Sequence, residues 1–350
     1  MLDPCLYFVF PGKLTINTGG YHYDRQLITE LERSGIAITP IALSEKFPFP
    51  DESALTQANQ ALASIPDDSI VILDGLAFGA MKSIAEAQKN RLCLIALCHH
   101  PLAMETGLDR NQRKLLLDSE AHALKCARRI IVTSQNTRKI LVEDYSVAAS
   151  KITVALPGTG EYVFAECNGA PPQLLTCASL TKRKGHDVLI ESLKCLKHQH
   201  WEARFVGDES LDPAWASALK ERIKSSGLND RIELVGTVKN LTTEYQKADV
   251  FVLPSRFEGY GMVLSEALAH GLPIISTDAG AIPEVVPKSA GILVAPGDHL
   301  ALAAAIQKII VDRDLRKKMQ LNAQTIAHDL PSWKNCAECV IKGVEEISKR

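Results

Sequence analysis

Short apolar runs of strand length alternate with amphipathic stretches along most of the chain. In the first part, the apolar runs are Leu6–Phe10, Ala37–Leu43, Ser69–Leu73, Leu92–Cys98, Ile130–Thr133 and Ile152–Ala155. Between these runs, apolar residues recur with helical spacing at Tyr21–Ser34, at Glu52–Ser64, in a long stretch that ends near Arg128, and after Ser134. Ser134 can act as the N-cap of the last of these helices. Strands that alternate with helices are typical of parallel sheets with helical crossovers. This part of the chain therefore predicts a Rossmann-like domain.

Residues 157–172 interrupt this alternation. They contain three glycines and three prolines with little periodicity, which indicates a linker. A second alternation follows, with strand-like runs at Gln173–Ala178, Ala203–Val206, Ile232–Val235, Val250–Leu253 and Pro273–Ser276, helical stretches at His186–Lys197, Pro213–Ser226, Leu241–Ala248, Met262–His270 and Leu300–Asp312, and a terminal helix at Asn335–Ser348. We therefore expect an α/β protein with two Rossmann-like, doubly wound parallel-sheet domains, residues 1–160 and 161–331, that face each other across a cleft.

A glycine turn lies between a strand and a helix in residues 254–271. Gly259 and Gly261 allow backbone N–H groups to approach a ligand, and the helix that starts at Met262 directs its positive dipole end to the same place, so a diphosphate fits there. Glu258 and Glu266 bracket the turn as E-x₇-E, and ionised carboxylates accept hydrogen bonds from hydroxyl groups. The pattern indicates a nucleotide-sugar. The simpler alternative is that Glu258 is a helix N-terminal acid and Glu266 an exposed helix residue.

Residues 258–262, Glu-Gly-Tyr-Gly-Met, together with Glu266 and the segment Thr277–Glu284, resemble the family 4 glycosyltransferases, which have the GT-B fold. The resemblance implies hexosyl transfer from a nucleoside-diphosphate sugar, such as a UDP- or GDP-sugar, to an acceptor hydroxyl with retention of anomeric configuration, the leaving phosphate assisting deprotonation of the acceptor. It also implies that a helix in residues 332–350 packs back on the acceptor-side N-terminal domain. The implied donor-binding residues are Gly19, Gly20, Arg183, Lys184, Glu258, Gly259, Tyr260, Gly261, Met262 and Glu266, and the implied catalytic residues are His99, Lys184 and Glu258.

A basic loop follows the first strand of the second domain. Family members place a lysine here against the donor diphosphate, and Lys184, which is followed by a glycine, matches that lysine. The arginine usually found about five residues earlier in the family is replaced by Ser179, and Arg183 is the candidate substitute. The alternative is a solvated basic loop before a helix.

In the first domain, His99-His100-Pro101 follows an apolar strand, so an imidazole stands at the carboxyl end of that strand, where sites in α/β folds form. In related enzymes, a histidine two residues before a proline lies over the transferred sugar. This spacing selects His99, with His100 as its rival and a structural histidine as the alternative. Gly19-Gly20 resembles the N-terminal glycine loop of the family, although a flexible turn would contain the same residues.

Composition narrows the partners and the compartment. A net charge of −2 and 5% aromatic residues do not suit a nucleic-acid surface. No apolar run reaches the length of a membrane span, which leaves peripheral membrane contact open. Nine scattered cysteines favour a reducing cytoplasm, and the close pair Cys336 and Cys339 has no matching second pair to complete a zinc site.

Metal ions and cofactors are not expected to take part in the reaction. Asp312-Arg-Asp314 spells D-x-D, but it begins a helical run, and acids at a helix N-terminus explain it better than a metal site. We therefore expect metal-independent transfer to a sugar, lipid-linked or small-molecule acceptor. The alternatives are a nucleotide-sugar-binding protein that has lost catalysis, suggested by Ser179, and a nucleotide-sugar epimerase on the same fold.

Overall fold

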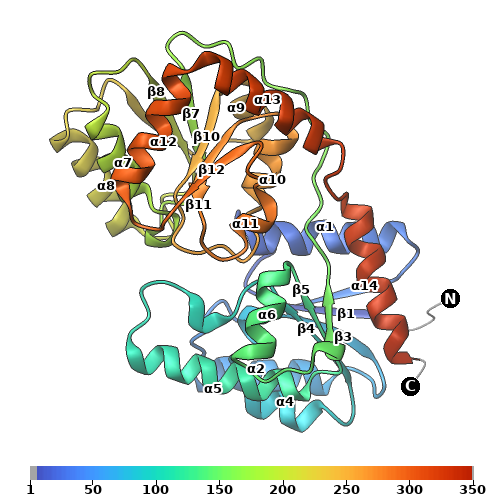
Figure 1. The fold of residues 1–350 in the computed structure, drawn as a ribbon. Helices are drawn as coiled ribbons and strands as arrows, with labels where there is room; N and C mark the ends of the chain where they lie inside the picture. Colours follow the sequence, from blue (N-terminus) through green and yellow to red (C-terminus); the bar gives the residue numbers. More distant parts are fainter. Residues whose placement is uncertain (1–5, 349–350) are drawn as a thin grey trace. The chain divides into compact units, whose positions relative to one another are not determined.

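The computed structural model describes residues 6–348 and divides the chain into two compact units (Figure 1). The N-terminal unit contains residues 1–158 and 331–350, and the C-terminal unit contains residues 159–330. Each unit has a six-stranded sheet in which all described strand pairs are parallel. This confirms the predicted α/β class with two doubly wound sheets.

The sheet of the N-terminal unit has the order β2-β1-β3-β4-β5-β6. Its strands are β1 Leu6–Pro11, β2 Ile38–Leu43, β3 Ile70–Asp74, β4 Cys93–Cys98, β5 Arg129–Val132 and β6 Ile152–Val154. Its helices are α1 Gly19–Arg33, α2 Glu52–Ala63, α3 Gly75–Phe78, α4 Lys82–Gln88, α5 Arg110–Cys126, α6 Gln135–Glu143 and α14 Trp333–Ser348, with short 3₁₀ turns at Leu102–Met104 and Ala149–Lys151. The strand order reverses direction between β1 and β3, which makes this the topological switch point of the sheet.

The sheet of the C-terminal unit has the order β12-β11-β10-β7-β8-β9. Its strands are β7 Gln173–Cys177, β8 Glu202–Val206, β9 Ile232–Gly236, β10 Val250–Leu253, β11 Ile274–Thr277 and β12 Gly291–Val294. Its helices are α7 His186–Cys195, α8 Pro213–Ser225, α9 Leu241–Lys247, α10 Met262–Ala269, α11 Ile282–Val285, α12 His299–Val311 and α13 Arg313–Ala327, with a 3₁₀ turn at Lys182–Lys184. Here the switch point lies between β7 and β10.

Burial on both faces explains why the central strands are continuous apolar runs. Every residue of β3 and of β10 is buried, because helices cover both sides of a parallel sheet. Ser134 is an N-cap, as the sequence predicts: its side chain accepts a hydrogen bond from the Thr137 N–H, and α6 begins at Gln135. The short helices α3, α4 and α11 and the strand β12 were not predicted.

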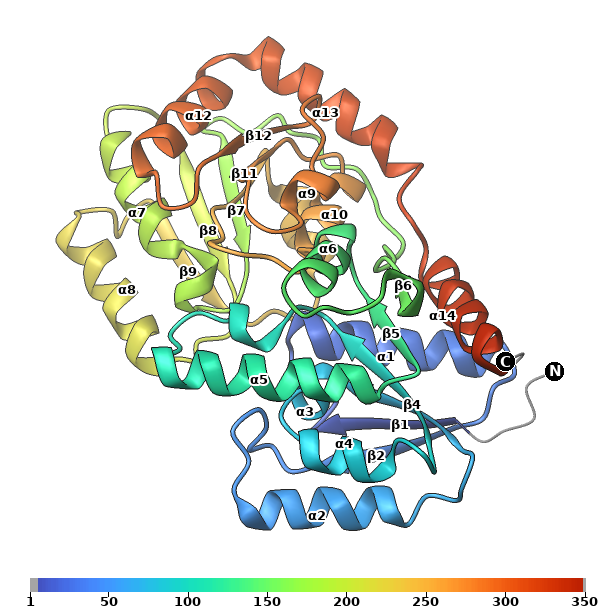
Figure 2. The same ribbon diagram turned by 60° about the horizontal axis from the view of Figure 1, so that its bottom comes forward.

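The terminal helix α14 belongs to the N-terminal unit, where it packs against α1 and β5 (Figures 1 and 2). The buried Cys336 thiol donates to the Tyr23 hydroxyl at 3.1 Å, and the Arg129 guanidinium pairs with Glu346 at 2.8 Å. The Trp333 ring meets the Tyr23 ring edge to face with centroids 5.5 Å apart. The last helix therefore completes the core of the first unit.

Candidate active site

Two loops of the C-terminal unit meet at its switch point. The loop after β7 carries Arg183 and Lys184, the loop after β10 carries Glu258, and β7 and β10 are neighbours in the sheet. Ligands of open parallel sheets bind at the carboxyl ends of the strands beside such a point. The strand order therefore brings together residues about 74 positions apart in the chain.

Close backbone packing ties the two loops together. Gly185 has a positive φ of 73°, and a Cβ atom there would lie 2.1 Å from the Pro254 carbonyl oxygen, so only glycine fits. The Arg256 N–H donates to the Arg183 carbonyl at 2.7 Å. The Arg256 guanidinium also forms two hydrogen bonds with the Asp187 carboxylate, at 3.0 and 2.8 Å.

Three charged side chains, the charged trio of Arg183, Lys184 and Glu258, form one ion-paired group in these loops. Lys184 Nζ lies 2.6 Å from Glu258 Oε1, and an Arg183 guanidinium nitrogen lies 3.2 Å from Glu258 Oε2. The Ser255 hydroxyl donates to Glu258 Oε1 at 2.6 Å. The Glu258 side chain is only 6% exposed, so it is a buried carboxylate with two cationic partners and not a solvated helix acid.

The two cations of the trio keep the Glu258 carboxylate ionised. Burial by itself raises the pKa of Glu258, but the charges of Lys184 and Arg183 and the hydrogen bonds from Lys184 and Ser255 outweigh burial and lower the pKa to about 2. Two cations and one carboxylate leave the trio with one net positive charge. Such a group attracts an anion to the carboxyl edge of the sheet.

The second predicted motif, Thr277–Glu284, forms hydrogen bonds with the backbone of the loop that carries Glu258. The Ala281 N–H donates to the Glu258 carbonyl at 2.9 Å, and the Thr277 hydroxyl donates to the Ser255 carbonyl at 2.6 Å. Gly280 has a positive φ of 59°, and a Cβ atom there would lie 2.3 Å from the Glu258 carbonyl oxygen. The motif thus fixes the backbone on which Glu258 is carried.

The glycine turn leads directly into α10. Gly259 and Tyr260 lie in the turn and are buried, Gly261 takes the N-cap position with a positive φ of 92°, and Met262 is the first helical residue. Helix α7 likewise begins directly after the β7 loop. The positive ends of two helices therefore lie at the carboxyl edge of neighbouring strands, together with the trio.

Glu266 lies one turn into α10 and is partly exposed. Its Oε2 atom accepts a hydrogen bond from the buried Tyr245 hydroxyl at 2.8 Å. Burial raises the pKa of Glu266, and the bond from Tyr245 opposes that rise. The Tyr245 ring is itself fixed by stacking on His270 at 4.9 Å, so it orients the carboxylate of Glu266.

In the N-terminal unit, three side chains form a histidine cluster of Asp24, Asp74 and His99. His99 Nε2 lies 3.1 Å from Asp24 Oδ1 and 3.5 Å from Asp74 Oδ2. Asp74 ends β3, His99 follows β4, and Asp24 lies on α1 after β1, so the cluster is at the switch point of this sheet. Both carboxylates are buried, while the His99 side chain is 16% exposed.

The two carboxylates hold His99 in its charged form. Burial lowers the pKa of His99, but Asp24 and Asp74 raise it by more, to a net value well above neutral. The pKa of Asp24 is raised, because burial and the neighbouring Asp74 charge outweigh the attraction of His99. At neutral pH His99 is thus a hydrogen-bond donor at both ring nitrogens. His100, the rival, lies 3.3 Å from Glu105 and is not part of this cluster.

One expectation about the backbone is wrong. Gly19 and Gly20 are not a loop: they are the first residues of α1, which Thr18 caps. A Cβ atom on Gly20 would lie 3.2 Å from His99 Cδ2, so the missing side chain lets α1 pack beside the imidazole. The helix forms here because Thr18 supplies the N-cap and the apolar face that follows is buried in the unit.

Several residues of these groups were missed by sequence reasoning. They are Asp24, Asp74, Tyr245, Ser255 and Arg256. Asp74 had a signal, since it stands at the carboxyl end of an apolar strand as His99 does. Asp24 had a weaker one, because a carboxylate on the apolar face of an amphipathic helix is unusual without a partner. Asp312 was interpreted correctly: it is the N-cap of α13 and accepts from the Leu315 N–H at 2.9 Å.

Comparisons with known proteins show a family match for part of the chain. Residues 165–326 match the model of the glycosyl transferases group 1. Mannosylfructose-phosphate synthase of Agrobacterium fabrum is 30% identical over 237 residues, which are 62% of this chain and 52% of that protein. The lipopolysaccharide core biosynthesis mannosyltransferase LpsB of Rhizobium meliloti is 36% identical over 138 residues, 37% of this chain and 39% of that protein. The chain thus spans about half or less of the length of these relatives.

Solved structures resemble the whole chain. Sucrose-phosphate synthase from Thermosynechococcus elongatus has a TM-score of 0.83 at 20% identity, with 98% of this chain and 99% of that chain covered. The Anabaena protein HepE in complex with UDP-glucose has a TM-score of 0.76 at 18% identity, with 98% and 100% covered. The chain therefore has the two-domain GT-B fold, and its residues 165–326 match the glycosyl transferases group 1.

Proposed function

We propose that this chain is a retaining glycosyltransferase of family 4 that transfers a hexose-type sugar from a nucleoside-diphosphate sugar to an acceptor hydroxyl without a metal ion. The observation that carries the proposal is the charged trio at the switch point of the C-terminal unit, beside the N-termini of α7 and α10. Named relatives that transfer mannose or synthesise sugar phosphates, and a neighbouring fold solved with UDP-glucose, support a sugar-nucleotide donor.

The diphosphate binds to Lys184 and Arg183 in this proposal. An ammonium has three N–H donors and a guanidinium has five, so each side chain can hold Glu258 and a phosphate oxygen at the same time. As the glycosidic bond breaks, negative charge grows on the departing diphosphate, and a preorganised cationic group stabilises it without moving. Arg183 supplies the second cation of the group, which offsets the loss of the family arginine at Ser179.

The two glutamates act at opposite ends of the donor. Glu266, oriented by Tyr245, accepts from the ribose hydroxyls, which do not change during transfer. Glu258 faces the sugar, which gains positive charge in the transition state. The structure adds a second task to Glu258, because the same carboxylate also holds both cations. The backbone N–H groups of the turn Gly259–Met262 complete the anion site.

His99 serves as a donor to the sugar and not as a base. The raised pKa of His99 keeps the imidazole protonated at neutral pH, and a protonated imidazole cannot accept a proton from the acceptor. The acceptor oxygen therefore bonds to the anomeric carbon on the face from which the diphosphate departs, and its proton passes to the departing phosphate. Attack on that face retains the configuration. Gly19 and Gly20 contribute N–H groups from the first turn of α1, where a helix has no internal partners for them.

A cytoplasmic location fits the cysteines, because all eight that the structure describes are free thiols. No helix within residues 6–348 combines the length and apolar character of a membrane span.

The deciding experiment combines binding with turnover. Purified chain is screened for thermal stabilisation by UDP-, GDP- and ADP-sugars, and the donors that stabilise it are incubated with candidate acceptors while nucleoside-diphosphate release is followed. Release that depends on an acceptor, with an axial or equatorial product linkage matching the donor by NMR, supports retaining transfer. Stabilisation without release against every acceptor indicates a binding protein, and a changed sugar in donor-only samples indicates an epimerase.

A further inference from the structure

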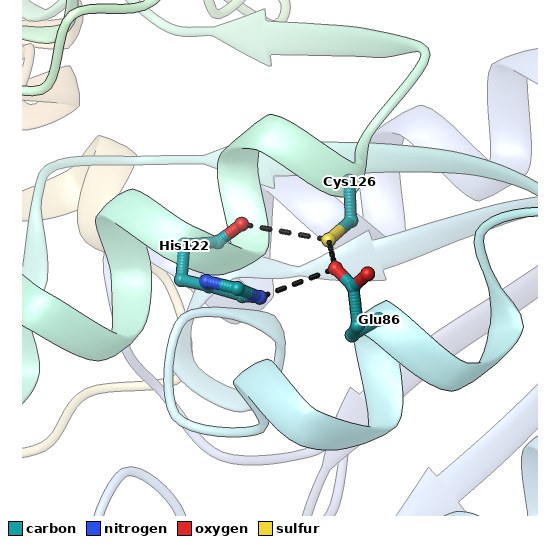
Figure 3. Close-up of side chains that lie close together, drawn as sticks. All are labelled: Glu86, His122 and Cys126. Carbon is teal, nitrogen blue, oxygen red and sulfur yellow. Dashed lines mark hydrogen bonds and ion pairs between the residues drawn. The ribbon is translucent and has the colours of Figure 1, made fainter.

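Three metal-ligating side chains from two neighbouring helices form a cluster on the N-terminal unit (Figure 3). His122 and Cys126 are four residues apart on α5 and so share one helix face, and Glu86 comes from α4, which packs against α5. Figure 3 shows the imidazole, the thiol and the carboxylate directed toward one another. We call Glu86, His122 and Cys126 the α4–α5 cluster.

The spacing of the cluster is close to that of a tetrahedral metal site. His122 Nε2 and Cys126 Sγ each lie 3.2 Å from Glu86 Oε2, and the three ligand atoms all lie within 4.8 Å of one another. Zinc bonds of about 2.0–2.3 Å at tetrahedral angles place ligand atoms about 3.3–3.6 Å apart. Small side-chain rotations at the exposed Glu86 and His122 bring all three atoms around one ion.

The charges of the cluster suit a cation that displaces a proton. The Glu86 carboxylate is ion-paired with the Lys89 ammonium. Lys89 bonds to Oε1, which leaves Oε2 directed at His122 and Cys126. The Cys126 thiol donates a hydrogen bond to Glu86 Oε2, and a metal ion between the two groups would replace that proton.

We propose that the α4–α5 cluster binds one Zn²⁺ ion through Cys126 Sγ, His122 Nε2 and Glu86 Oε2, with a water molecule in the fourth position. One thiolate, one imidazole and one carboxylate form the ligand set that borderline divalent ions prefer, whereas Mg²⁺ and Ca²⁺ prefer oxygen ligands alone. Binding breaks the Cys126 S–H bond, forms a Zn–S bond and releases the proton to solvent. No electrons are exchanged.

The site is separate from the histidine cluster. Glu86 and Cys126 lie near the carboxyl ends of α4 and α5, just before β4 and β5 begin. They are therefore at the amino edge of the parallel sheet, while His99 and Asp74 stand at its carboxyl edge. The zinc site links α4 to α5 and takes no part in glycosyl transfer. A negative result in the zinc experiment would therefore leave the proposed function intact, and the reverse also holds.

Metal titration of the full chain tests the site. The reduced, chelator-stripped protein is titrated with Zn²⁺ against a chromophoric chelator, and with Co²⁺ as a spectroscopic probe. We expect one equivalent of tight binding, a thiolate-to-cobalt charge-transfer band, and no competition from Mg²⁺. Cys126→Ser should abolish the band, and Cys126→Ser and His122→Gln should each weaken binding by at least the roughly 10- to 100-fold seen when supporting residues of metal sites are changed.

An exposed thiol of the other unit provides the matched control. Cys195→Ser removes a free thiol outside the cluster and should bind Zn²⁺ and Co²⁺ as the unchanged chain does. Circular dichroism checks that each variant is folded, and Zn²⁺ should raise the Tm of the unchanged chain but not that of Cys126→Ser. Equal metal binding by the unchanged chain and the folded Cys126→Ser variant, or loss of the cobalt band in Cys195→Ser, would overturn the proposal.

Discussion

Glu258 is buried and yet ionised, because Lys184 and Arg183 share its two oxygens. Sequence reasoning placed the cations on the diphosphate and the carboxylates on hydroxyl groups of the donor, as separate contacts. The pairing makes them one unit, so changing any member alters the charge and position of the other two. A variant of Glu258 should therefore disturb the proposed diphosphate contacts as well as the proposed sugar contact, whereas a variant of Glu266 should disturb only the hydrogen bond from Tyr245 and the proposed ribose contact.

The two glutamates should separate kinetically. Glu266→Ala removes a contact to an unchanging part of the donor, so it should raise the donor KM about tenfold and leave kcat nearly intact. Glu258→Gln removes charge that matters most in the transition state, so it should lower kcat by about ten- to a hundredfold, the worth of a charged hydrogen bond of roughly 1.5–3 kcal/mol. Steady-state kinetics of both variants checks this, and the reversed pattern would mean that the donor lies in the opposite orientation.

His99 should stabilise the N-terminal unit as well as act on the sugar. His99→Gln leaves the buried Asp24 and Asp74 without their cation, which should lower the free energy of unfolding by about 3–5 kcal/mol. Adding Asp24→Asn should recover part of the loss, because it removes one of the two unpaired charges. Urea unfolding of the two single variants and the double variant measures the coupling, and strictly additive losses would argue against this role.

At the scale of elements, periodicity predicted the long helices and the apolar strands, because both repeat their pattern several times. The four-residue helices α3 and α11 are too short to complete a period, and β12, Gly291–Val294, offers only three apolar side chains after its glycine. The trio depends on β7 lying next to β10, which is a property of strand order and not of any local segment. Lys184 and Glu258 were thus predicted as site residues, while their pairing was not.

Helix α7 contains a pH-dependent element in His186, its first residue. The ring is fully buried, and neither ring nitrogen has a hydrogen-bond partner among the described residues. Burial, with a contribution from the Lys184 charge, lowers the pKa of His186 to about 4. As pH falls, His186 therefore becomes protonated below about pH 6.5 in the unfolded chain, but only near pH 4 in the folded chain.

The direction in which pH changes the stability follows from this difference in proton binding. The contribution of His186 to stability is present above pH 6.5 and is lost as pH falls through the window down to about 4, by at most about 1.4 kcal/mol per pH unit. His186→Phe, which keeps a ring against Phe205, should flatten this part of the stability profile. Chemical unfolding of both proteins at intervals between pH 7 and pH 4 gives the slopes. Equal slopes in this window would show that His186 does not set the acid sensitivity.

At the scale of the whole molecule, both units place their functional groups by the same rule. Each has its charged cluster at the switch point of a parallel sheet, the histidine cluster beside β1 and β3 and the trio between β7 and β10. The terminal helix α14 completes the N-terminal unit through Tyr23 and Arg129, and Tyr23 packs edge to face on His99 at 5.2 Å. Alternation along the chain predicted this architecture because every described strand except β6 is followed by a helix.

Turnover should persist in excess EDTA, because the proposed mechanism meets the charge of the leaving diphosphate with Lys184, Arg183 and helix N-termini. The same treatment should remove the Zn²⁺ ion proposed at the α4–α5 cluster without a change in kcat. Product formation with and without chelator measures this directly. Activity that vanishes in EDTA and returns with Mg²⁺ or Mn²⁺ would require a metal in the reaction.

The central claim, that Lys184 is part of the diphosphate site, is tested most directly by comparing two lysines of one loop. Lys182 is exposed and lies over the Trp215 ring at 5.5 Å, whereas Lys184 is bonded to the buried Glu258. We predict that Lys184→Ala lowers kcat/KM for the donor by about 100- to 1,000-fold, the cost of removing one preorganised group at roughly 2.7–4 kcal/mol. Lys182→Ala should change it less than about threefold, since its effect is confined to a surface contact. Equal kcat/KM values for the two folded variants would contradict the account.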